Sequence, residues 1–424
     1  MAKKKVEKPK REVTKRQLSR WQQQKKRQRI ILGSGIAVIV IVLGIVGAGV
    51  YNKWYIAEYK PLHETVIEVN ETKFDMDYYV KMLKYYGEGV STQYMPLVAD
   101  EVVSIIGRNE LIKQEAMELG ISVSNDEVNQ SLKNYDPPLS KDYEDVVRTE
   151  ILVNKLLDEY FELEVPRFAE QRHILAMFLE SDSQVNEVSA RLEAGEDFAE
   201  LAGELSLDAI CKAQKGDLGW RPEGILTMLL ESSILDEHAF GCELGVLSQP
   251  IYDETKIKTV GYWLLEVLDR DEAAAEAHVR VILLASEREA NDVRTRLDAG
   301  EGFATLAKEF SQHDGSRESG GEFVVSSSDT VSETLTEFAL NSELGVLSQP
   351  IRDDAVYTKG GYWLLKVVAV DDNRQIEKEN RDLLKGDALN KWVEELRDDP
   401  ENKVVTYLDD EKKQWAIWHL FIAS

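Results

Sequence analysis

Three blocks of sequence occur twice in this chain, in the same order. ELGVLSQPI at 243–251 returns at 343–351, GYWLLEV at 261–267 returns as GYWLLKV at 361–367, and RLEAGEDFAELA at 191–202 returns as RLDAGEGFATLA at 296–307. The first two pairs are offset by 100 residues and the third by 105. Ordered repetition of this kind indicates that residues 166–271 and 277–371 are two copies of one folding unit.

Each copy has the same predicted order of elements. A short apolar strand comes first, then a helix ending in Ala-Gly, a helix with the pattern Phe-Ala-x-Leu-Ala, a Gly-containing turn, a helical stretch and a closing strand rich in aromatic and branched residues. Strands mixed with helices in about a hundred residues predict an α+β unit, with helices packed on a small sheet.

The region before the repeats is predicted to be a helical module at 62–165. Residues 97–119 carry apolar groups at helical spacing, and Gly120 suits the residue after a helix end. Ser124 and Glu127 fit a capping box that opens the next helix. After the repeats, residues 374–397 have an amphipathic helical pattern. We expect the C-terminal helix and tail, 374–424, to complete the helical module.

Residues 30–50 are the segment best suited to cross a membrane. They contain no charged residue, and a helix of this length is about 31 Å long, close to the ~30 Å hydrocarbon core. Residues 1–29 hold 13 Lys and Arg against Glu7 and Glu12, which predicts a basic cytoplasmic tail and a body outside the cytoplasm. We therefore expect a single-pass protein of the cell membrane. The alternative is a cleaved signal peptide, which normally has a shorter apolar region.

Charge and rare residues exclude several classes of function. The whole chain carries −26 despite its basic tail, so the acidic body is unsuited to nucleic acid. The six histidines are scattered and no Cys-x-x-Cys pair is present, so neither a metal site nor a cofactor is expected. Cys211 and Cys242 are expected to be free thiols, although a single bridge between them remains an alternative.

The first copy carries a series of short motifs in a fixed order. They are Arg172-His173-Ile174-Leu175, then Gly195 to Phe198 and Leu201-Ala202, Ser206-Leu207-Asp208, Gly216-Asp217-Leu218-Gly219-Trp220, and Gly245, Ser248 and Pro250. In order and spacing these motifs resemble the parvulin family of PpiC-type prolyl isomerases. The helical module resembles the N-terminal chaperone domain of SurA-, PrsA- and PpiD-type foldases, through Val69-Asn70 and residues 114–128. This resemblance implies a chaperone module, two tandem parvulin-like domains and a returning C-terminal helix.

The resemblance also implies a site in the first copy. The family places one histidine on the first strand and one on the last, beneath the bound proline, with an acidic or thiol group nearby. Carried over, His173 and Asp208 are the expected catalytic residues. The expected substrate-binding residues are Leu218, Leu226, Leu230, Phe240 and Trp263, the last standing where the second histidine belongs.

The second copy departs further from the family pattern. Val281 stands in for the first histidine, His313 for the acidic residue and Trp363 for the second histidine. We interpret it as a structural or client-binding repeat.

Two functions remain open on this basis. The first is a membrane-anchored prolyl cis-trans isomerase that assists newly exported polypeptides, with weak activity confined to the first copy. Rotation about an X-Pro amide needs no covalent chemistry, so an apolar pocket can retain activity without one histidine. The alternative is a non-catalytic chaperone that holds unfolded clients. A structural anchor for other envelope proteins is a third function, which the sequence favours less. Oligomeric state, clients and envelope type are left open.

Overall fold

The computed structural model describes residues 39–49, 51, 55–56, 59–271, 273–326 and 331–422, and divides into two units. The first unit comprises residues 1–158 with 390–424, and the second comprises residues 159–389. Of the predicted membrane segment 30–50, only residues 39–49 are described, and they are helical. Among the described residues, no helix is both long enough and apolar enough to cross a bilayer. The basic tail at 1–29 lies outside the described residues.

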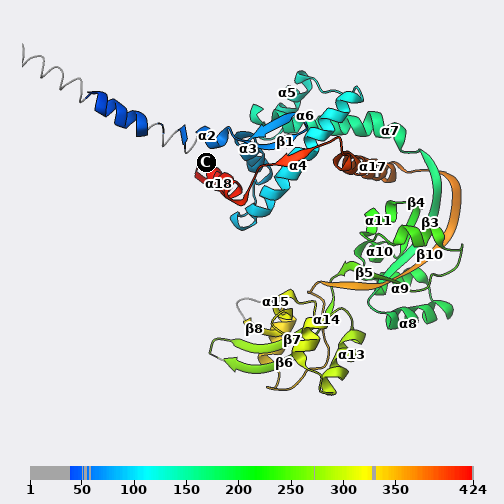
Figure 1. Ribbon diagram of the computed structural model, residues 1–424. Coiled ribbons are helices and arrows are strands. Elements are labelled where there is room, and N and C mark those ends of the chain that lie inside the picture. Colours follow the sequence, from blue (N-terminus) through cyan, green and yellow to red (C-terminus); the bar gives the residue numbers. More distant parts are fainter. Residues whose placement is uncertain are drawn as a thin grey trace, which may run out of the picture. The chain divides into compact units, whose positions relative to one another are not determined.

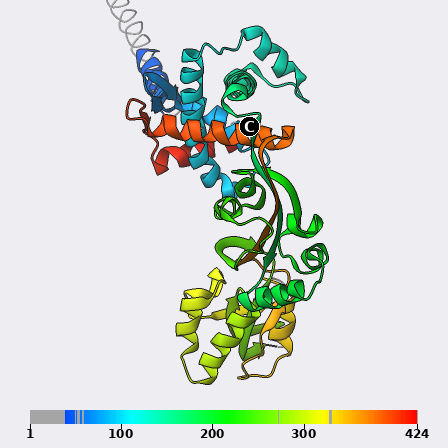
Figure 2. The same ribbon diagram turned by 90° about the vertical axis from the view of Figure 1, so that its right-hand side faces the viewer.

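The first unit is a helical module around a three-stranded sheet. The sheet has the order β11-β1-β2, formed by Val404–Thr406, Thr65–Val69 and Thr72–Asp75. The helices are α2 (Lys60–Leu62), α3 (Met76–Tyr86), α4 (Met95–Glu118), α5 (Asn125–Asn134), α6 (Glu144–Lys155) and α18 (Asp410–Ile422). The two C-terminal elements enter this unit, because β11 pairs with β1 and α18 lies beside α3 and α4 (Figures 1 and 2).

Local sequence signals explain the helix boundaries of this unit. The predicted capping box is confirmed: the Ser124 hydroxyl accepts from the Glu127 amide, and the Glu127 carboxylate accepts from the Ser124 amide at 2.8 Å. The core is formed by the apolar faces of α3 and α4 against β1, and includes Val66, Tyr79, Val102 and Ile106.

The second unit holds two four-stranded antiparallel sheets. One has the order β4-β3-β10-β5, formed by Asp217–Pro222, Phe168–Leu179, Thr358–Gln375 and Ile251–Lys258. The other has the order β8-β7-β6-β9, formed by Glu322–Ser326, Glu276–Leu284, Gly261–Asp271 and Ile351–Asp353. The sheets with their helices are here called the proximal subdomain (168–258 with 358–375) and the inserted subdomain (261–353). The predicted α+β class is confirmed.

Helices cover both faces of each sheet. In the proximal subdomain, α8 (Asp182–Glu193) and α9 (Phe198–Leu205) pack on one face, and α10 (Ala209–Ala213), α11 (Ile225–Leu230) and α12 (Leu235–Gly241) on the other. In the inserted subdomain, α13 (Glu287–Asp298) and α14 (Phe303–Phe310) share one face and α16 (Glu333–Asn341) packs on the other. The remaining helices are α7 (Phe161–Glu164), α15 (Asp314–Arg317) and α17 (Lys378–Asp398).

The sheets do not follow the repeat boundaries 166–271 and 277–371. The closing strand of the first repeat, β6, pairs with β7 and β9 of the second repeat, while the closing strand of the second repeat, β10, pairs with β3 and β5 of the first. The repeats have thus exchanged their closing strands. The inserted subdomain is complete within 261–353, with its closing strand first, and it interrupts the proximal subdomain between β5 and β10 (Figure 1).

The Gly-Tyr-Trp sequence that opens both closing strands has a packing reason. A Cβ atom on Gly361 would lie 2.4 Å from the Phe178 ring and 2.7 Å from the Leu179 carbonyl oxygen, and one on Gly261 would lie 2.7 Å from Leu283. Only glycine fits where the strand approaches its neighbour this closely. The tryptophan two residues later is fully buried in both sheets.

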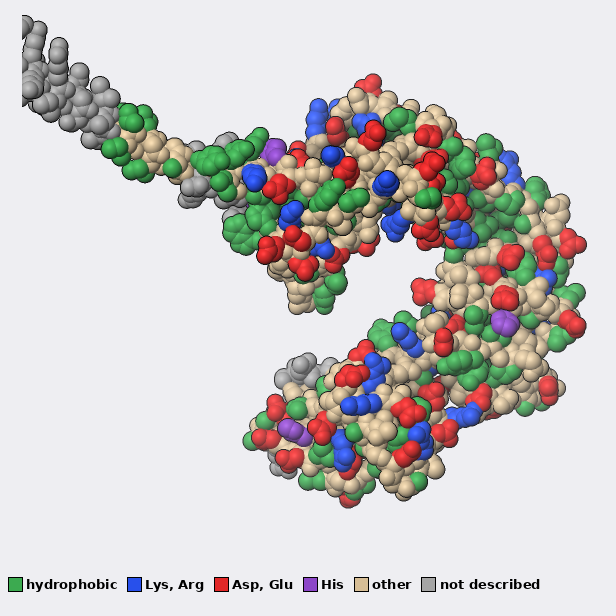
Figure 3. Space-filling model, viewed as in Figure 1, with side chains coloured by type: hydrophobic (Ala, Val, Ile, Leu, Met, Phe, Trp, Pro, Cys, Tyr) green, Lys and Arg blue, Asp and Glu red, His purple; other side chains and the backbone are tan. Residues whose placement is uncertain are grey.

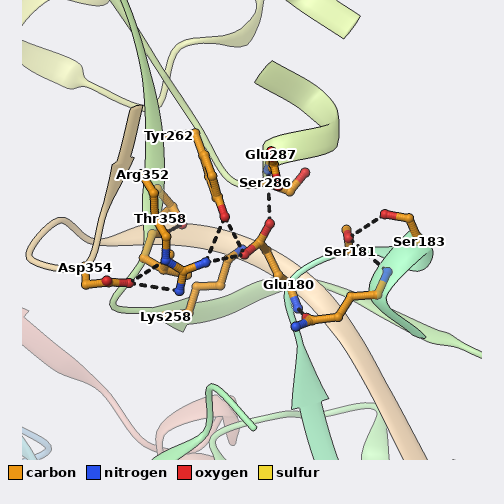
Figure 4. Close-up of polar contacts among 12 residues, drawn as sticks. Glu180, Ser181, Ser183, Lys258, Tyr262, Ser286, Glu287, Arg352, Asp354 and Thr358 are labelled. Atoms are coloured by element: carbon orange, nitrogen blue, oxygen red, sulfur yellow. Dashed lines mark hydrogen bonds and ion pairs between the residues drawn. The ribbon is translucent and has the colours of Figure 1, made fainter. Parts of the chain in front are cut away.

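A buried carboxylate joins the two subdomains. Glu180, at the end of β3, accepts hydrogen bonds from the Tyr262 hydroxyl (3.0 Å), the Glu287 amide (3.0 Å) and the Arg352 guanidinium (3.1 Å), all in the inserted subdomain (Figure 4). Nearby, Lys258 donates to the Gly360 carbonyl where the chain leaves and re-enters the proximal sheet. Burial lowers the pKa of Lys258 to about 8. These contacts satisfy the polar groups that the crossing buries.

Candidate functional site

The predicted apolar pocket residues lie together in the proximal subdomain. Leu218 on β4 and Leu226 and Leu230 on α11 are almost fully buried in one cluster with Trp363, and Phe240 on α12 packs against it. Phe240 also lines a cavity of about 330 Å³ together with Pro222, Ile376 and Leu384. The sequence therefore identified side chains that do assemble, and most of them form a filled core.

Trp263 lies elsewhere than predicted. Because the closing strands are exchanged, Trp263 belongs to the core of the inserted subdomain, and Trp363 occupies the corresponding place in the proximal subdomain. The Trp363 indole donates to Asp253 at 3.1 Å, and the Trp263 indole donates to Asp353 at 2.9 Å. The tryptophan that packs with Leu218, Leu226 and Leu230 is thus Trp363.

Asp208 sits within this core, in a polar network. Its side chain is 6% exposed, accepts from the Cys211 amide at 2.9 Å at the start of α10, and lies 3.0 Å from the Lys256 ammonium on β5. Lys256 also donates to the Leu230 carbonyl at 2.7 Å. Burial raises the pKa of the neighbouring Cys211 thiol far above its ordinary range, so this cysteine is an inert thiol. Cys211 and Cys242 are both free.

His173 is not part of that network. Its Nε2 atom lies 2.7 Å from Asp217, and its ring packs against Trp220 at 5.6 Å between ring centroids. Partial burial would raise the pKa of Asp217, but the contact with His173, the hydrogen bond from the Gly219 amide and the Arg221 charge together hold that pKa below its usual value. The structure therefore does not bring His173 and Asp208 together.

Strand alternation explains why His173 and Asp208 are separated. Ile174, Ala176 and Phe178 face the cluster that contains Leu218, whereas Met177 and Leu179 face the opposite helices. Successive side chains on a strand point to opposite faces, so His173 belongs to the face of Met177. It points away from the predicted pocket.

Matching hydrogen bonds relate the first strands of the two repeats. The Ala176 amide donates to the Gly216 carbonyl and the Val281 amide to the Gly321 carbonyl, both at 2.9 Å, so Ala176 is the structural equivalent of Val281. The equivalent of His173 is then His278, at the repeat offset of 105. The sequence contained this signal, but the Arg-His-Ile-Leu match aligned His173 with Val281 instead.

The inserted subdomain replaces the charged network with neutral groups. His313, in the place of Asp208, shares a hydrogen bond of 2.8 Å with the Ser316 hydroxyl and makes edge contacts with Trp263 and Phe323. Burial lowers its pKa. Val356, in the place of Lys256, is buried in the same core. This agrees with a repeat that has departed further from the family pattern.

A second candidate site lies in the first unit and was not predicted residue by residue. A groove of about 890 Å³ runs between α3, the loop before α6 and the end of α18. Its apolar lining includes Leu83, Tyr85, Val90, Met95, Tyr135, Pro137, Pro138, Leu139, Tyr143, Leu420 and Phe421. The sequence signals were the Asp136-Pro137-Pro138 break and the clustered tyrosines, but nothing in them indicated that the C-terminal helix forms one wall.

Comparison with protein families identifies the repeats. The model of the rotamase PPIC-type PPIASE domain matches residues 173–269 and 282–369. The chain therefore carries two parvulin-type rotamase domains. Each match follows the sequence repeat, so each includes the closing strand that the other sheet takes.

Similar proteins place these domains among foldases and chaperones. The foldase protein PrsA of Caldanaerobacter subterraneus is 28% identical over 211 residues, which cover 46% of this chain and 65% of that protein. The chaperone SurA of Chromohalobacter salexigens is 27% identical over 245 residues, covering 51% and 52%. The chaperone SurA of Nitrosospira multiformis is 26% identical over 408 residues, covering 80% and 88%. The chain thus spans between about half and nine tenths of the length of these relatives.

Solved structures of PrsA are also similar. The crystal structure of PrsA from Bacillus anthracis covers 82% of this chain and 94% of its own, at 12% identity and a TM-score of 0.26.

The buried network predicts that Asp208 matters more for stability than for contact with substrate. Asp208→Ala leaves the Lys256 ammonium buried without its partner, and we expect a loss of about 3–5 kcal/mol in the free energy of unfolding. His173→Ala breaks a partly exposed pair and is expected to cost less than about 1 kcal/mol. Urea denaturation followed by circular dichroism measures both.

The matched control is the double variant Asp208→His with Lys256→Val. It installs the neutral pair found in the inserted subdomain, leaves no charge unpaired, and is expected to be more stable than Asp208→Ala. If Asp208→Ala proves as mild as His173→Ala, the network does not stabilise the core.

Proposed function

We propose that this chain is a foldase-type chaperone that binds unfolded, newly exported polypeptides and is anchored in the cell membrane by residues 30–50. Its two parvulin-type domains and its PrsA and SurA relatives support a role in folding. The basic residues before the apolar segment support a body outside the cytoplasm. Acidic side chains are spread over the face shown in Figure 3 rather than gathered in one patch, which suits a soluble surface more than a charged binding site.

The observation that carries a binding role is the apolar filling of both domain centres. Ala176 and Trp363 in the proximal subdomain, and Val281 and Trp263 in the inserted subdomain, are fully buried in the two cores. We infer that these side chains take the places of the family's two histidines, so that aliphatic and indole groups replace its polar set. The proximal subdomain still holds one buried polar pair, Asp208 and Lys256. Both side chains already have partners within the core, the Cys211 amide and the Leu230 carbonyl.

The groove of the first unit is the proposed client-binding surface. Its wall is mostly aromatic and aliphatic, and it is open to solvent, so it suits the apolar side chains that an unfolded polypeptide exposes. Tyr135 and Tyr85 are held by hydrogen bonds to Glu150 at 2.5 and 3.4 Å, which keeps their rings in place along the groove.

Prolyl isomerisation is the second candidate function. Leu218, Leu226 and Leu230 assemble in one apolar cluster, and Phe240 borders a cavity, which favours binding of a proline ring. Isomerisation needs only a pocket that favours the twisted amide, so activity at a low level is compatible with these residues.

The soluble body, residues 60–424, separates these two candidates in paired assays. Uncatalysed isomerisation of an X-Pro bond takes about tens to hundreds of seconds. In a protease-free assay on X-Pro peptides we expect the protein to accelerate it no more than about twofold. In a parallel aggregation assay on an unfolded client, we expect clear suppression. Strong acceleration that survives His173→Ala would establish an isomerase whose site uses the apolar residues alone.

Phe421 tests the groove. It is 51% exposed on α18 and lines the groove, so Phe421→Glu places a charge on the apolar wall and is expected to reduce suppression of aggregation several-fold. Trp418→Glu is the matched control, because Trp418 is 56% exposed on the same helix and does not line the groove. Equal effects of the two substitutions would remove the groove as the binding surface.

Membrane attachment is tested on the full chain in cells. We expect the protein to sediment with membranes, to keep its N-terminus by intact mass, and to become soluble when residues 30–50 are deleted. External protease should digest the body and spare the basic tail. A product that lacks residues 1–50 would show a cleaved signal peptide instead.

A further inference from the structure

The two closing strands compete for the same two places. Both begin Gly-Tyr-Trp-Leu-Leu, and both bury the tryptophan, the second leucine and the following valine. Exchanging β6 and β10 would therefore bury nearly the same apolar surface in either sheet. Hydrophobic burial alone does not explain why each sheet takes the strand of the other repeat.

The first difference between these strands is Glu266 in β6 and Lys366 in β10. Glu266 lies opposite Arg280 on β7, and the guanidinium is 3.0 Å from the carboxylate in a partly buried pair. Lys366 lies opposite Leu175 on β3. Leu175 and Arg280 are equivalent positions of the two sheets, so direct pairing within each repeat would place Lys366 opposite Arg280. Like charges directly opposite each other destabilise a strand pair.

The second difference is Arg270 in β6 and Val370 in β10. Val370 lies opposite Arg172, whose guanidinium is fixed by hydrogen bonds to the Ala239 and Cys242 carbonyls at 2.9 and 3.1 Å. Arg270 lies opposite Ala277. Direct pairing would place Arg270 opposite Arg172, a second pair of like charges on the other sheet.

We propose that these two positions select the exchanged pairing, so that charge decides which closing strand each sheet takes. Each sheet would receive one repulsive pair if the repeats closed on themselves, and receives none when the strands are exchanged. This device is independent of the proposed chaperone function. The exchanged pairing forms one subdomain from the contiguous residues 261–353, inserted within the other, so neither sequence repeat closes a sheet by itself.

Disulfide trapping in the full chain reports the pairing directly. In a background with Cys211→Ala and Cys242→Ala, the pair His173→Cys with Ala369→Cys reports the exchanged arrangement, because these positions are opposite each other. The matched pair His173→Cys with Asp269→Cys reports direct pairing, because Asp269 is equivalent to Ala369. After refolding and mild oxidation, we expect the first pair to cross-link and the second to remain reduced, as read by peptide mass.

The charges are then interchanged by Glu266→Lys, Lys366→Glu, Arg270→Val and Val370→Arg. The ratio of the 173–269 to the 173–369 cross-link is expected to rise by up to about thirtyfold, because two reversed pairs of ~1 kcal/mol each amount to ~2 kcal/mol. An unchanged ratio would overturn selection by charge, and a 173–269 cross-link in the parent would overturn the exchange itself.

Melting temperatures of simpler variants test the same proposal if the fourfold variant does not fold. Glu266→Lys alone sets two cations opposite each other in the exchanged sheet and is expected to lower the melting temperature. Adding Arg280→Glu should restore it, whereas Lys366→Glu, which faces Leu175, should change it little. Failure of Arg280→Glu to restore stability would show that this position does not discriminate between the strands.

Discussion

Each parvulin-type sheet is completed by a strand from the other repeat, and the rest of the second unit depends on that pairing. Trp363 closes the core built by α10, α11 and α12 and donates to Asp253, while Trp263 does the same with Asp353 in the inserted subdomain. Neither repeat holds a complete core within its own sequence. The proximal sheet takes β10 from beyond the inserted subdomain, so it is completed only when chain segments from both sides of residues 261–353 pair.

Local features of the fold were predictable, and the pairing of distant strands was not. The helix that begins at Ser124 was read from its capping box because the signal lies within four residues. The choice between β6 and β10 had no such signal in the apolar pattern, since the two strands read alike. The charges that would clash on direct pairing lie at 266/366 and 270/370, and their effect depends on Arg280 and Arg172, which lie on other strands. The prediction that each closing strand belongs to its own repeat, at 166–271 and 277–371, followed from proximity in sequence, and the strand pairing contradicts it.

The site shows how a short motif and the repeat spacing can disagree. Arg-His-Ile-Leu set His173 and Val281 at the same place in the two copies, but they are 108 residues apart and the repeat offset is 105. A shift of three residues along a strand turns a side chain to the opposite face. The offset of 105 that relates the helical blocks also relates His173 to His278, and Ala176 to Val281. The apolar residues Leu218, Leu226 and Leu230 do lie in one buried cluster, and their role in binding substrate stays a prediction.

The contacts of Asp208 indicate that this carboxylate stabilises the core of the proximal subdomain. Asp208 begins α10, pairs with Lys256 on β5, and Lys256 reaches the carbonyl at the end of α11, so two helices and a strand meet at one ion pair. A buried pair is tolerated only when both charges are fully satisfied, and removal of either one is costly. Such a pair cannot reorient toward a substrate without losing those contacts. The proposed client binding therefore needs a surface without such a buried ion pair, and the tyrosine-lined groove of the first unit is one.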